Sequence, residues 1–126
     1  MILRHVALTC SSEKNSDRFY KDLMCLEKSE PKNLPMPLSK AIFKIDAELL
    51  MIHYRGKAVH FEVFITDCPV NHNRRIDHVC LEVDDLKSFL QKCRDLGVEI
   101  SQIPRGNRTL TFIRDFDGNI FEIKSE

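Results

Sequence analysis

Two segments of this chain, one near its start and one past its middle, share the residue pattern His-Val-x-Leu. Residues 5–8 read His-Val-Ala-Leu, and residues 78–81 read His-Val-Cys-Leu. Two later segments also match, because residues 61–63 read Phe-Glu-Val and residues 121–123 read Phe-Glu-Ile. An internal repeat constrains the fold strongly, since both copies must adopt the same supersecondary structure. The sequence therefore predicts a single domain, 1–126, built from a duplicated unit, with copies at about 1–67 and 76–126.

The first copy predicts a strand, then a helix, then three strands. Residues 2–10 form the expected first strand, and Ser11 or Ser12 can cap a helix whose apolar residues recur at helical spacing. The other expected elements are a short strand at 26–30, a proline-rich loop with a helical turn near 38–44, and strands at 48–54 and 58–65 joined by a turn at 55–57.

The second copy predicts the same order of elements after a polar connector at 67–75. Asp84 or Asp85 can cap its helix, and Gly97 is the expected helix stop. Its expected strands are 76–83, 98–103, 110–114 and 120–124, with turns at 104–108 and 115–119. The predicted fold is therefore α+β: two tandem βαβββ units that form a cupped mixed sheet with the helices outside.

Composition excludes several classes of function. The chain has 19 basic and 19 acidic residues, whereas a dedicated nucleic-acid-binding protein usually carries a basic excess. No apolar run approaches the length needed to span a membrane, and the N-terminus lacks the features of a signal peptide. The five cysteines are odd in number and form no Cys-x-x-Cys pair, which favours reduced packing residues. We expect a cytoplasmic protein with no nucleic-acid or membrane partner.

The repeated letters also place polar residues on a common face of the predicted sheet. Side chains alternate along a strand, so the large apolar residues of all four repeated segments point to one face. The opposite face carries His5, Glu62, His78 and Glu122. If the two sheets curve around a shared cavity, these four side chains converge.

Two imidazoles and two carboxylates suit a divalent ion such as zinc, nickel, cobalt, manganese or ferrous iron. Such a set leaves coordination positions open for water or substrate, as catalytic metal sites require. The alternative is structural: a lone histidine on a strand is more often a hydrogen-bonded core residue, and a lone glutamate is usually solvated. The recurrence of both residue types in two copies favours the metal site.

The whole chain resembles the vicinal oxygen chelate superfamily, which contains glyoxalase I, methylmalonyl-CoA epimerase, extradiol dioxygenases and bleomycin-resistance proteins. The resemblance lies in HVALTCSSEKNSDRFYKDLMCLEKSE, in DHVCLEVDDLKSFLQKCRDLGVEI and in FIRDFDGNIFEI. Two positions depart from the usual pattern: Cys25 stands where glycine is common, and Phe116 stands where proline is common.

The resemblance implies metal ligands on the first and fourth strands of each unit. These positions are His5, Glu62, His78 and Glu122, the same residues that the repeat indicates. His53 is a rival to Glu62 if its strand is the fourth one. We interpret His53 and His60 as ordinary strand residues, and His72 as a loop residue.

The resemblance also implies an activity: a metal-dependent lyase or isomerase, similar to glyoxalase I or methylmalonyl-CoA epimerase, that stabilises an enediolate on a divalent ion. Glu122 is the candidate base, and Glu62 is a ligand or second base. The substrate is expected to be a small molecule with neighbouring oxygens, and Arg105, Asn107 and Arg108 could bind an anionic tail if they are not simply a solvated turn.

Two other functions compete with this one. The first is a metal-free protein that sequesters a small molecule, as bleomycin-resistance proteins do, although such relatives tend to lose the ligand residues. The second is a ferrous dioxygenase, whose usual single-chain form is longer. A homodimer is also expected, because units of this superfamily pair within one chain or are exchanged between two.

Overall fold

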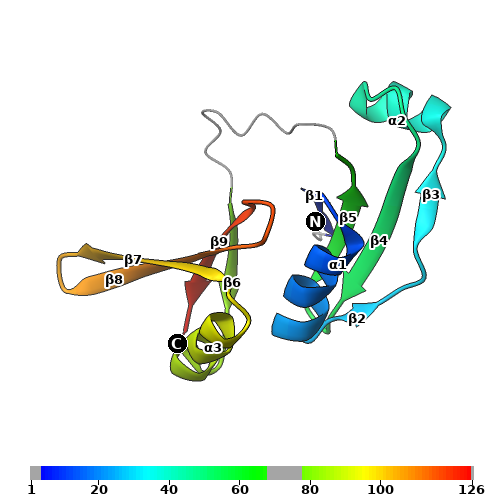
Figure 1. Ribbon diagram of the computed structural model, residues 1–126. Helices are drawn as coiled ribbons and strands as arrows, with labels where there is room; N and C mark the ends of the chain where they lie inside the picture. The colour runs from blue at the N-terminus through cyan, green and yellow to red at the C-terminus, as the bar shows by residue number, and fades with distance from the viewer. Residues whose placement is uncertain (1–3, 68–77, 126) are drawn as a thin grey trace. The chain divides into compact units, whose positions relative to one another are not determined.

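The computed structural model describes residues 4–67 and 78–125, and it divides between Val70 and Asn71 into two compact units (Figure 1). Each unit is a mixed sheet with a helix against one face, which confirms the predicted α+β fold. Cys68 and His72, whose roles the sequence suggested, lie outside the described residues.

Unit 1 begins with the predicted strand and helix. Its elements are β1 (Val6–Cys10), α1 (Glu13–Ser16), the π-helical η1 (Asp17–Leu23), β2 (Glu27–Lys28), β3 (Lys32–Leu34), α2 (Met36–Phe43), β4 (Leu49–Arg55) and β5 (His60–Ile65). The strands lie in the order β1-β5-β4-β2, and β3 also pairs with β4. β1 and β5 are parallel, so the first and last strands of the unit are neighbours.

Unit 2 has the same topology in fewer elements. It contains β6 (Val79–Glu82), α3 (Leu86–Asp95), β7 (Glu99–Arg105), β8 (Arg108–Arg114) and β9 (Ile120–Lys124). The strand order is β6-β9-β8-β7, again with a parallel pair formed by the first and last strands, β6 and β9. The sequence repeat therefore corresponds to a repeated topology, in which a strand and a helix are followed by antiparallel strands, the last of which pairs in parallel with the first.

The registers of the two parallel pairs show that the repeated residues are structurally equivalent. Val6 lies opposite Phe61 in unit 1, and Val79 lies opposite Phe121 in unit 2. Phe61 and Phe121 are at most 1% exposed, so the apolar face of each sheet is the face that packs in the core, as the alternation of the strands predicts.

The two principal helices follow the predicted capping and packing. The Ser12 side chain accepts a hydrogen bond from the Asn15 N–H, and the Asp85 carboxylate does the same for the Ser88 N–H. The buried helical side chains repeat at intervals of three or four residues, which aims one face at the sheet. They include Phe19, Tyr20, Leu23, Leu90 and Cys93.

Three sequence predictions about local structure need correction. β3 was not predicted, and α2 begins at Met36 rather than near residue 38. The predicted turn at 104–108 is a two-residue turn at Gly106 and Asn107, because the strands run to Arg105 and Arg108. Pro104 is tolerated there because β7 is an edge strand, where a missing N–H need not break a ladder.

The β4–β5 hairpin also differs from its prediction. The turn was expected at 55–57, but the Gly56 N–H donates to the Val59 carbonyl at 2.8 Å, so the turn lies further along the chain. As a result His53 lies directly opposite Glu62, and Arg55 lies opposite His60. Both pairs are on the face of the sheet away from the helix, and this shift decides the composition of the candidate site.

Cys25, which stands where the resembled superfamily commonly has glycine, adopts a left-handed backbone with φ of 56°. A side chain in this region is strained by roughly 1–2 kcal/mol, whereas glycine is not. We expect Cys25→Gly to raise the free energy of unfolding by up to about 1 kcal/mol, since the unfolded-state entropy of glycine offsets part of the gain. Denaturant unfolding of both proteins measures the difference, and a clear loss of stability would show that the Cys25 side chain contributes more than its strain costs.

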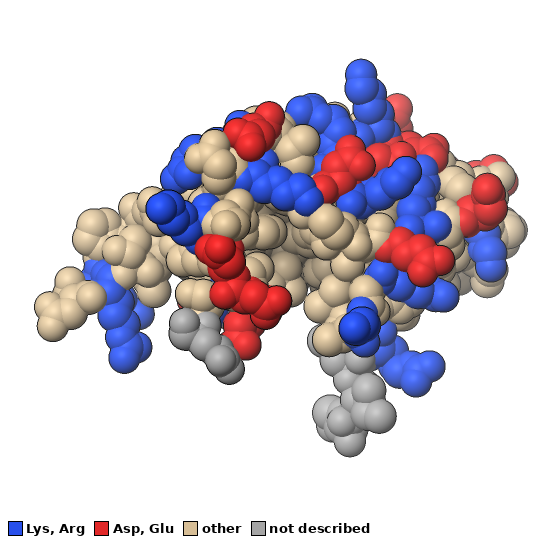
Figure 2. Space-filling view, turned by 90° about the horizontal axis from the view of Figure 1, so that it is seen from below, with Lys and Arg blue, Asp and Glu red and all other residues tan. Residues whose placement is uncertain are grey.

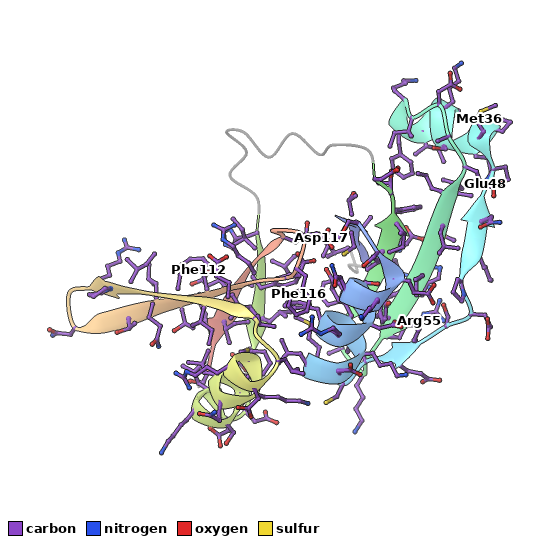
Figure 3. The ribbon with its side chains drawn as sticks, viewed as in Figure 1. Met36, Glu48, Arg55, Phe112, Phe116 and Asp117 are labelled. Carbon is purple, nitrogen blue, oxygen red and sulfur yellow. The ribbon has the colours of Figure 1, made fainter. Side chains whose placement is uncertain are left out.

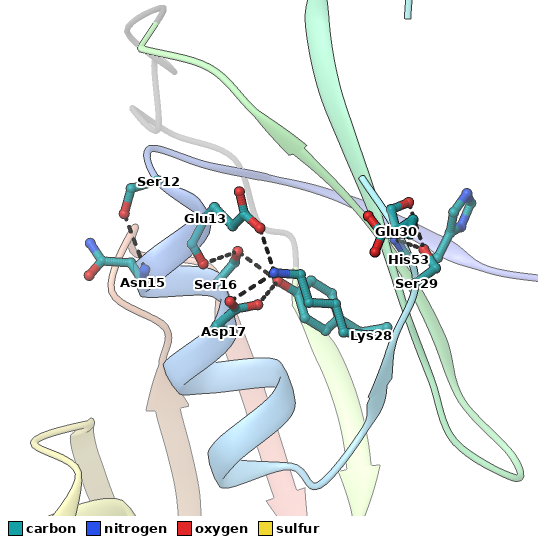
Figure 4. Close-up of polar contacts among 10 residues, drawn as sticks. Ser12, Glu13, Asn15, Ser16, Asp17, Lys28, Ser29, Glu30 and His53 are labelled. Atoms are coloured by element: carbon teal, nitrogen blue, oxygen red, sulfur yellow. Dashed lines mark hydrogen bonds and ion pairs between the residues drawn. The ribbon is translucent and has the colours of Figure 1, made fainter. Parts of the chain in front are cut away.

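A buried polar network joins the helix of unit 1 to its sheet (Figure 4). The Tyr54 hydroxyl donates to Asp17 Oδ1 at 2.7 Å and lies 2.9 Å from Ser16 Oγ, while Lys28 Nζ lies 2.9 Å from Asp17 Oδ2. Burial raises the pKa of the Tyr54 hydroxyl, so it stays a proton donor. The network fixes how the helix sits over β4 and β2.

We expect Tyr54→Phe to destabilise the protein by about 1–3 kcal/mol, because it removes the hydroxyl donor to Asp17 Oδ1 and leaves the carboxylate to the more exposed contact of its other oxygen with Lys28. Ser16→Ala is the control, since it removes the other hydroxyl partner of Tyr54 but leaves the bond to Asp17 in place. Thermal unfolding of both variants tests the prediction, and an equal loss in the two would show that the charged partner is unimportant.

The charge balance of the chain extends to its surface. On the face seen in Figure 2, basic and acidic side chains of the described residues are interspersed over the elements. That face offers no single-sign field of the kind that a nucleic-acid-binding surface presents.

Candidate metal-binding site

In unit 1, the first and last strands bring a histidine and a glutamate together. His5 immediately precedes β1, Glu62 lies in β5, and His5 Nε2 is 3.3 Å from Glu62 Oε2. The imidazole is 43% exposed and the carboxylate 16% exposed. The glutamate is therefore held within the sheet, whereas the histidine ring remains accessible to solvent. The sequence predicted that both residues share the polar face, and the structure places them in contact.

Unit 2 forms the same pair from equivalent positions. His78 immediately precedes β6, Glu122 lies in β9, and His78 Nε2 is 3.6 Å from Glu122 Oε2. Here too the histidine is the more exposed partner, at 42% against 17%. Lys124 Nζ lies 3.7 Å from the other oxygen, Glu122 Oε1. Two units of one topology thus carry the same donor pair.

The donor pairs fit a divalent ion in both distance and chemistry. Two ligands of a tetrahedral zinc ion, each about 2.0–2.1 Å from the metal, lie roughly 3.3–3.4 Å apart. The 3.3 Å and 3.6 Å separations are close to this value. Within residues 4–67 and 78–125, however, no three His, Cys, Asp or Glu side chains already converge on one point as a bound metal requires. Each unit therefore supplies a pair of donors.

The residues that flank each glutamate differ between the units. Glu62 lies between Ala7 on β1 and His53 on β4. Glu122 lies between Cys80 on β6 and Phe112 on β8, which Figure 3 labels. The pKa of the Cys80 thiol is raised by burial and by the Glu122 carboxylate, so it remains a neutral thiol. Unit 1 is thus the richer in nitrogen donors.

His53 and His60, which the sequence suggested were ordinary strand residues, lie within the unit 1 site. His53 Nε2 is 3.8 Å from Glu62 Oε1, and His53 Nδ1 is 2.8 Å from His60 Nε2. The His5 and His60 rings are also neighbours, with centroids 5.5 Å apart. His53 was considered as a rival to Glu62, but the two are adjacent and face the same side. Their role was missed because the turn between β4 and β5 was predicted at the wrong position, and that turn decides which residues lie opposite each other.

Hydrogen bonding fixes which nitrogen of each of these two rings carries a proton. An arginine side chain can only donate, and Arg55 Nε, 3.4 Å from His60 Nε2, donates to it. His60 Nε2 is then an acceptor toward Arg55. His53 Nδ1 must therefore donate to His60, which leaves the lone pair of neutral His53 on Nε2, toward Glu62.

Burial, aided by neighbouring cations, favours these neutral forms. Burial lowers the pKa of His53, and Arg55 and Lys32 lower it further, although Glu62 acts in the opposite direction. Burial and Arg55 also lower the pKa of His60. Neutral imidazoles are the form that binds metal ions.

The residues suggested to bind an anionic tail, Arg105, Asn107 and Arg108, lie at the exposed tip of the β7–β8 hairpin. Their side chains are not among the donor pairs described above. The structure therefore agrees with the simpler interpretation of this segment as a solvated turn.

The comparison with known families covers nearly the whole chain. Residues 2–123 match the model of the Glyoxalase/Bleomycin resistance protein/Dioxygenase superfamily. The chain belongs to this superfamily. The resemblance that the sequence segments of both units indicated is thereby confirmed. No curated protein sequence matches the chain.

Solved structures share the glyoxalase fold at low sequence identity. A glyoxalase family protein from Enterococcus faecalis is 17% identical, with a TM-score of 0.73 over 96% of this chain and 94% of that one. Another from Bacillus cereus is 15% identical, with a TM-score of 0.73 over 100% and 94%. A mutant of the fosfomycin resistance protein FosX from Listeria monocytogenes, complexed with Mn(II) and 1S,2S-dihydroxypropylphosphonic acid, is 16% identical, with a TM-score of 0.70 over 97% and 87%.

None of the helices in the described part of this superfamily member is long and apolar enough to cross a membrane.

Proposed function

We propose that this glyoxalase superfamily protein is a divalent-metal-dependent lyase or isomerase that acts on a small molecule with two neighbouring oxygen atoms. The observation that carries the proposal is the duplicated donor pair, His5 with Glu62 and His78 with Glu122, at equivalent positions of two equivalent sheets. The Mn(II) bound by FosX, together with a ligand that carries hydroxyl groups on neighbouring carbons, supports this choice of chemistry.

In the proposed site the two pairs come together and all four residues are metal ligands, supplied by one chain or exchanged between two. A divalent ion bound there supplies Lewis acidity, which stabilises negative charge on a substrate oxygen. The carboxylate of Glu122 takes a proton from the carbon next to that oxygen and returns it to the neighbouring carbon, with Glu62 as a ligand or second base. Both carboxylates are partly buried in their strands, which restricts their motion for this role.

Metal binding and turnover by the purified protein test the proposal. The protein is dialysed against zinc, nickel, cobalt and manganese, and the bound metal is counted. Each loaded form is then assayed with an α-ketoaldehyde–thiol adduct, a branched acyl-CoA thioester and fosfomycin. We expect bound metal and a turnover that a chelator abolishes. Protein that binds none of the four metals would rule out the enzyme and favour the metal-free binding protein.

We also propose that the protein is a homodimer, since units of this kind can complete one another between chains. Light scattering at micromolar concentration is expected to give twice the mass of one chain. A monomer throughout that range would contradict the dimer and require the two pairs to meet within one chain.

A further inference from the structure

A small apolar pocket opens on the face of the unit 1 sheet that carries Glu62. Its volume is about 150 Å³. The residues that line it lie on β1, β4 and β5 and at the C-terminal end of α2, and all of them belong to unit 1. They include Ala7, Thr9, Phe43, Ile45, Leu49 and Phe64.

One wall of the pocket comes from α2, which lies beside the start of β4 (Figure 1) and has no counterpart among the described elements of unit 2. The fully buried Ser39 hydroxyl donates to the Ile45 carbonyl at 3.1 Å, and Lys44 adopts a left-handed backbone with φ of 61°. The chain therefore turns back at the end of the helix, so that Ile45 lines the pocket. The Phe43 ring packs edge-on against Phe64, with the ring centroids 5.1 Å apart.

The pocket begins next to the candidate metal ligand of unit 1. Ala7, a small and exposed residue that lines the pocket, lies directly opposite Glu62 in the parallel strand pair. Phe64 follows Glu62 by two residues on β5, so it is on the same face and about 7 Å further along the strand. A small molecule whose oxygens lie at Glu62 can therefore place an adjoining group in the pocket.

The size and the lining of the pocket favour an aromatic ring as that group. An engineered protein cavity of about 150 Å³, lined by Leu, Ile and Phe side chains, stays dry and binds benzene. Phe43 and Phe64 offer ring contacts that a third aromatic ring can extend. None of the lining residues is charged, so a phosphate or carboxylate in the pocket would lose its hydration without gaining an opposite charge.

From this geometry we propose that the pocket binds an aromatic ring of the substrate, which is therefore an aryl-substituted molecule with two neighbouring oxygens. The two oxygens rest on the proposed function. The ring site does not, because a free aromatic molecule can enter the pocket without metal or turnover.

The first experiment titrates the full, metal-free chain with toluene and follows binding by NMR. We expect saturable binding of one toluene per chain. Thr9→Phe, which puts a ring into the pocket from β1, is expected to weaken that binding by more than about 10-fold. Thr109→Phe, the same change at an exposed position of β8, is the matched control and leaves binding intact.

A second variant opens the pocket instead of filling it. Phe43→Ala removes one of the two aromatic walls at a residue that is 42% exposed, so the fold is expected to persist. Loss of an aromatic contact of this kind is expected to weaken toluene binding by about 2- to 10-fold.

The second experiment compares two hydroxamates, which present two neighbouring oxygens, on protein loaded with Ni²⁺. Phenylacetohydroxamate is expected to bind about 10- to 100-fold more tightly than acetohydroxamate, as burial of a phenyl ring implies. Thr9→Phe is expected to remove this difference while the affinity for acetohydroxamate stays unchanged.

Each result bears on one claim, and circular dichroism shows whether each variant is folded. If the wild type takes up no toluene, or if folded Thr9→Phe and Phe43→Ala both bind it as well as the wild type, the pocket is not a ring site. If toluene binds only after dilution to the monomer, a second copy of the chain fills the pocket and the substrate assignment is wrong. The assignment is also wrong if the two hydroxamates bind equally well. If the variants change toluene binding as expected in a protein that neither binds metal nor turns over substrate, the ring site stands and the proposed reaction fails.

Discussion

Glu122→Gln is expected to reduce turnover by a factor of about 100 to 10,000, because a lost general base typically costs that much. Glutamine keeps the shape of the side chain and one oxygen donor, but it has no negative charge and cannot take the proton. The expected change in the free energy of unfolding is small, within about 1 kcal/mol, since the ion pairs of Glu122 with His78 and Lys124 involve partly exposed partners.

Glu82→Gln is the matched control for this variant. Glu82 lies on the adjacent strand β6, is exposed and is not a proposed ligand. Its substitution by glutamine changes the charge of the protein by the same amount. Steady-state kinetics and thermal unfolding of both variants are compared at equal metal occupancy. Similar activity in the two would mean that Glu122 is a solvated strand residue, and the proposed base would be wrong.

The largest expected effects on stability come from the paired core residues of the repeat. Phe61→Ala and Phe121→Ala each remove a ring that is at most 1% exposed, at equivalent places in the two sheets. Truncation of a buried phenylalanine typically costs 3–5 kcal/mol, about a third or more of the stability of many domains.

Denaturant unfolding measures both losses, with Phe43→Ala as a control. Phe43 is 42% exposed on α2, so its truncation is expected to cost about 1 kcal/mol or less. An equally small loss for Phe61→Ala and Phe121→Ala would contradict the core that the parallel strand pairs define. A large loss in only one of them would show that the two units are unequal in stability.

The repeat made the topology and the donor pairs predictable. Strand alternation puts Phe61 and Glu62 on opposite faces, so a buried Phe61 requires Glu62 to face outward, and the same holds for Phe121 and Glu122. The contacts from His5 to Glu62 and from His78 to Glu122 follow once the first and last strands of each unit pair in parallel. The meeting of the two pairs at one ion stays a prediction.

The roles of His53 and His60 could not be predicted, because they depend on the position of one turn. A turn centred on Gly56 pairs His53 with Val59, and His53 then faces away from Glu62. The observed turn is closed by Gly56 and Val59, and it shifts the pairing of β4 with β5 by an odd number of residues. His53 therefore lies on the same face of the sheet as Glu62. A one-residue or three-residue slip exchanges the faces of every side chain in a strand, so a small error in the turn changes the composition of the site.

The parallel pairing of first and last strands in each unit has a kinetic consequence. The donors of a pair stand at opposite ends of their unit in the sequence, so the pair exists only after the ends have met. If the proposed ion binds, it would cross-link the two ends of a finished unit, and contacts made after the folding barrier slow unfolding without speeding folding. Metal loading should lengthen the lifetime of the native state under denaturant or protease, while the refolding rate stays that of the metal-free chain.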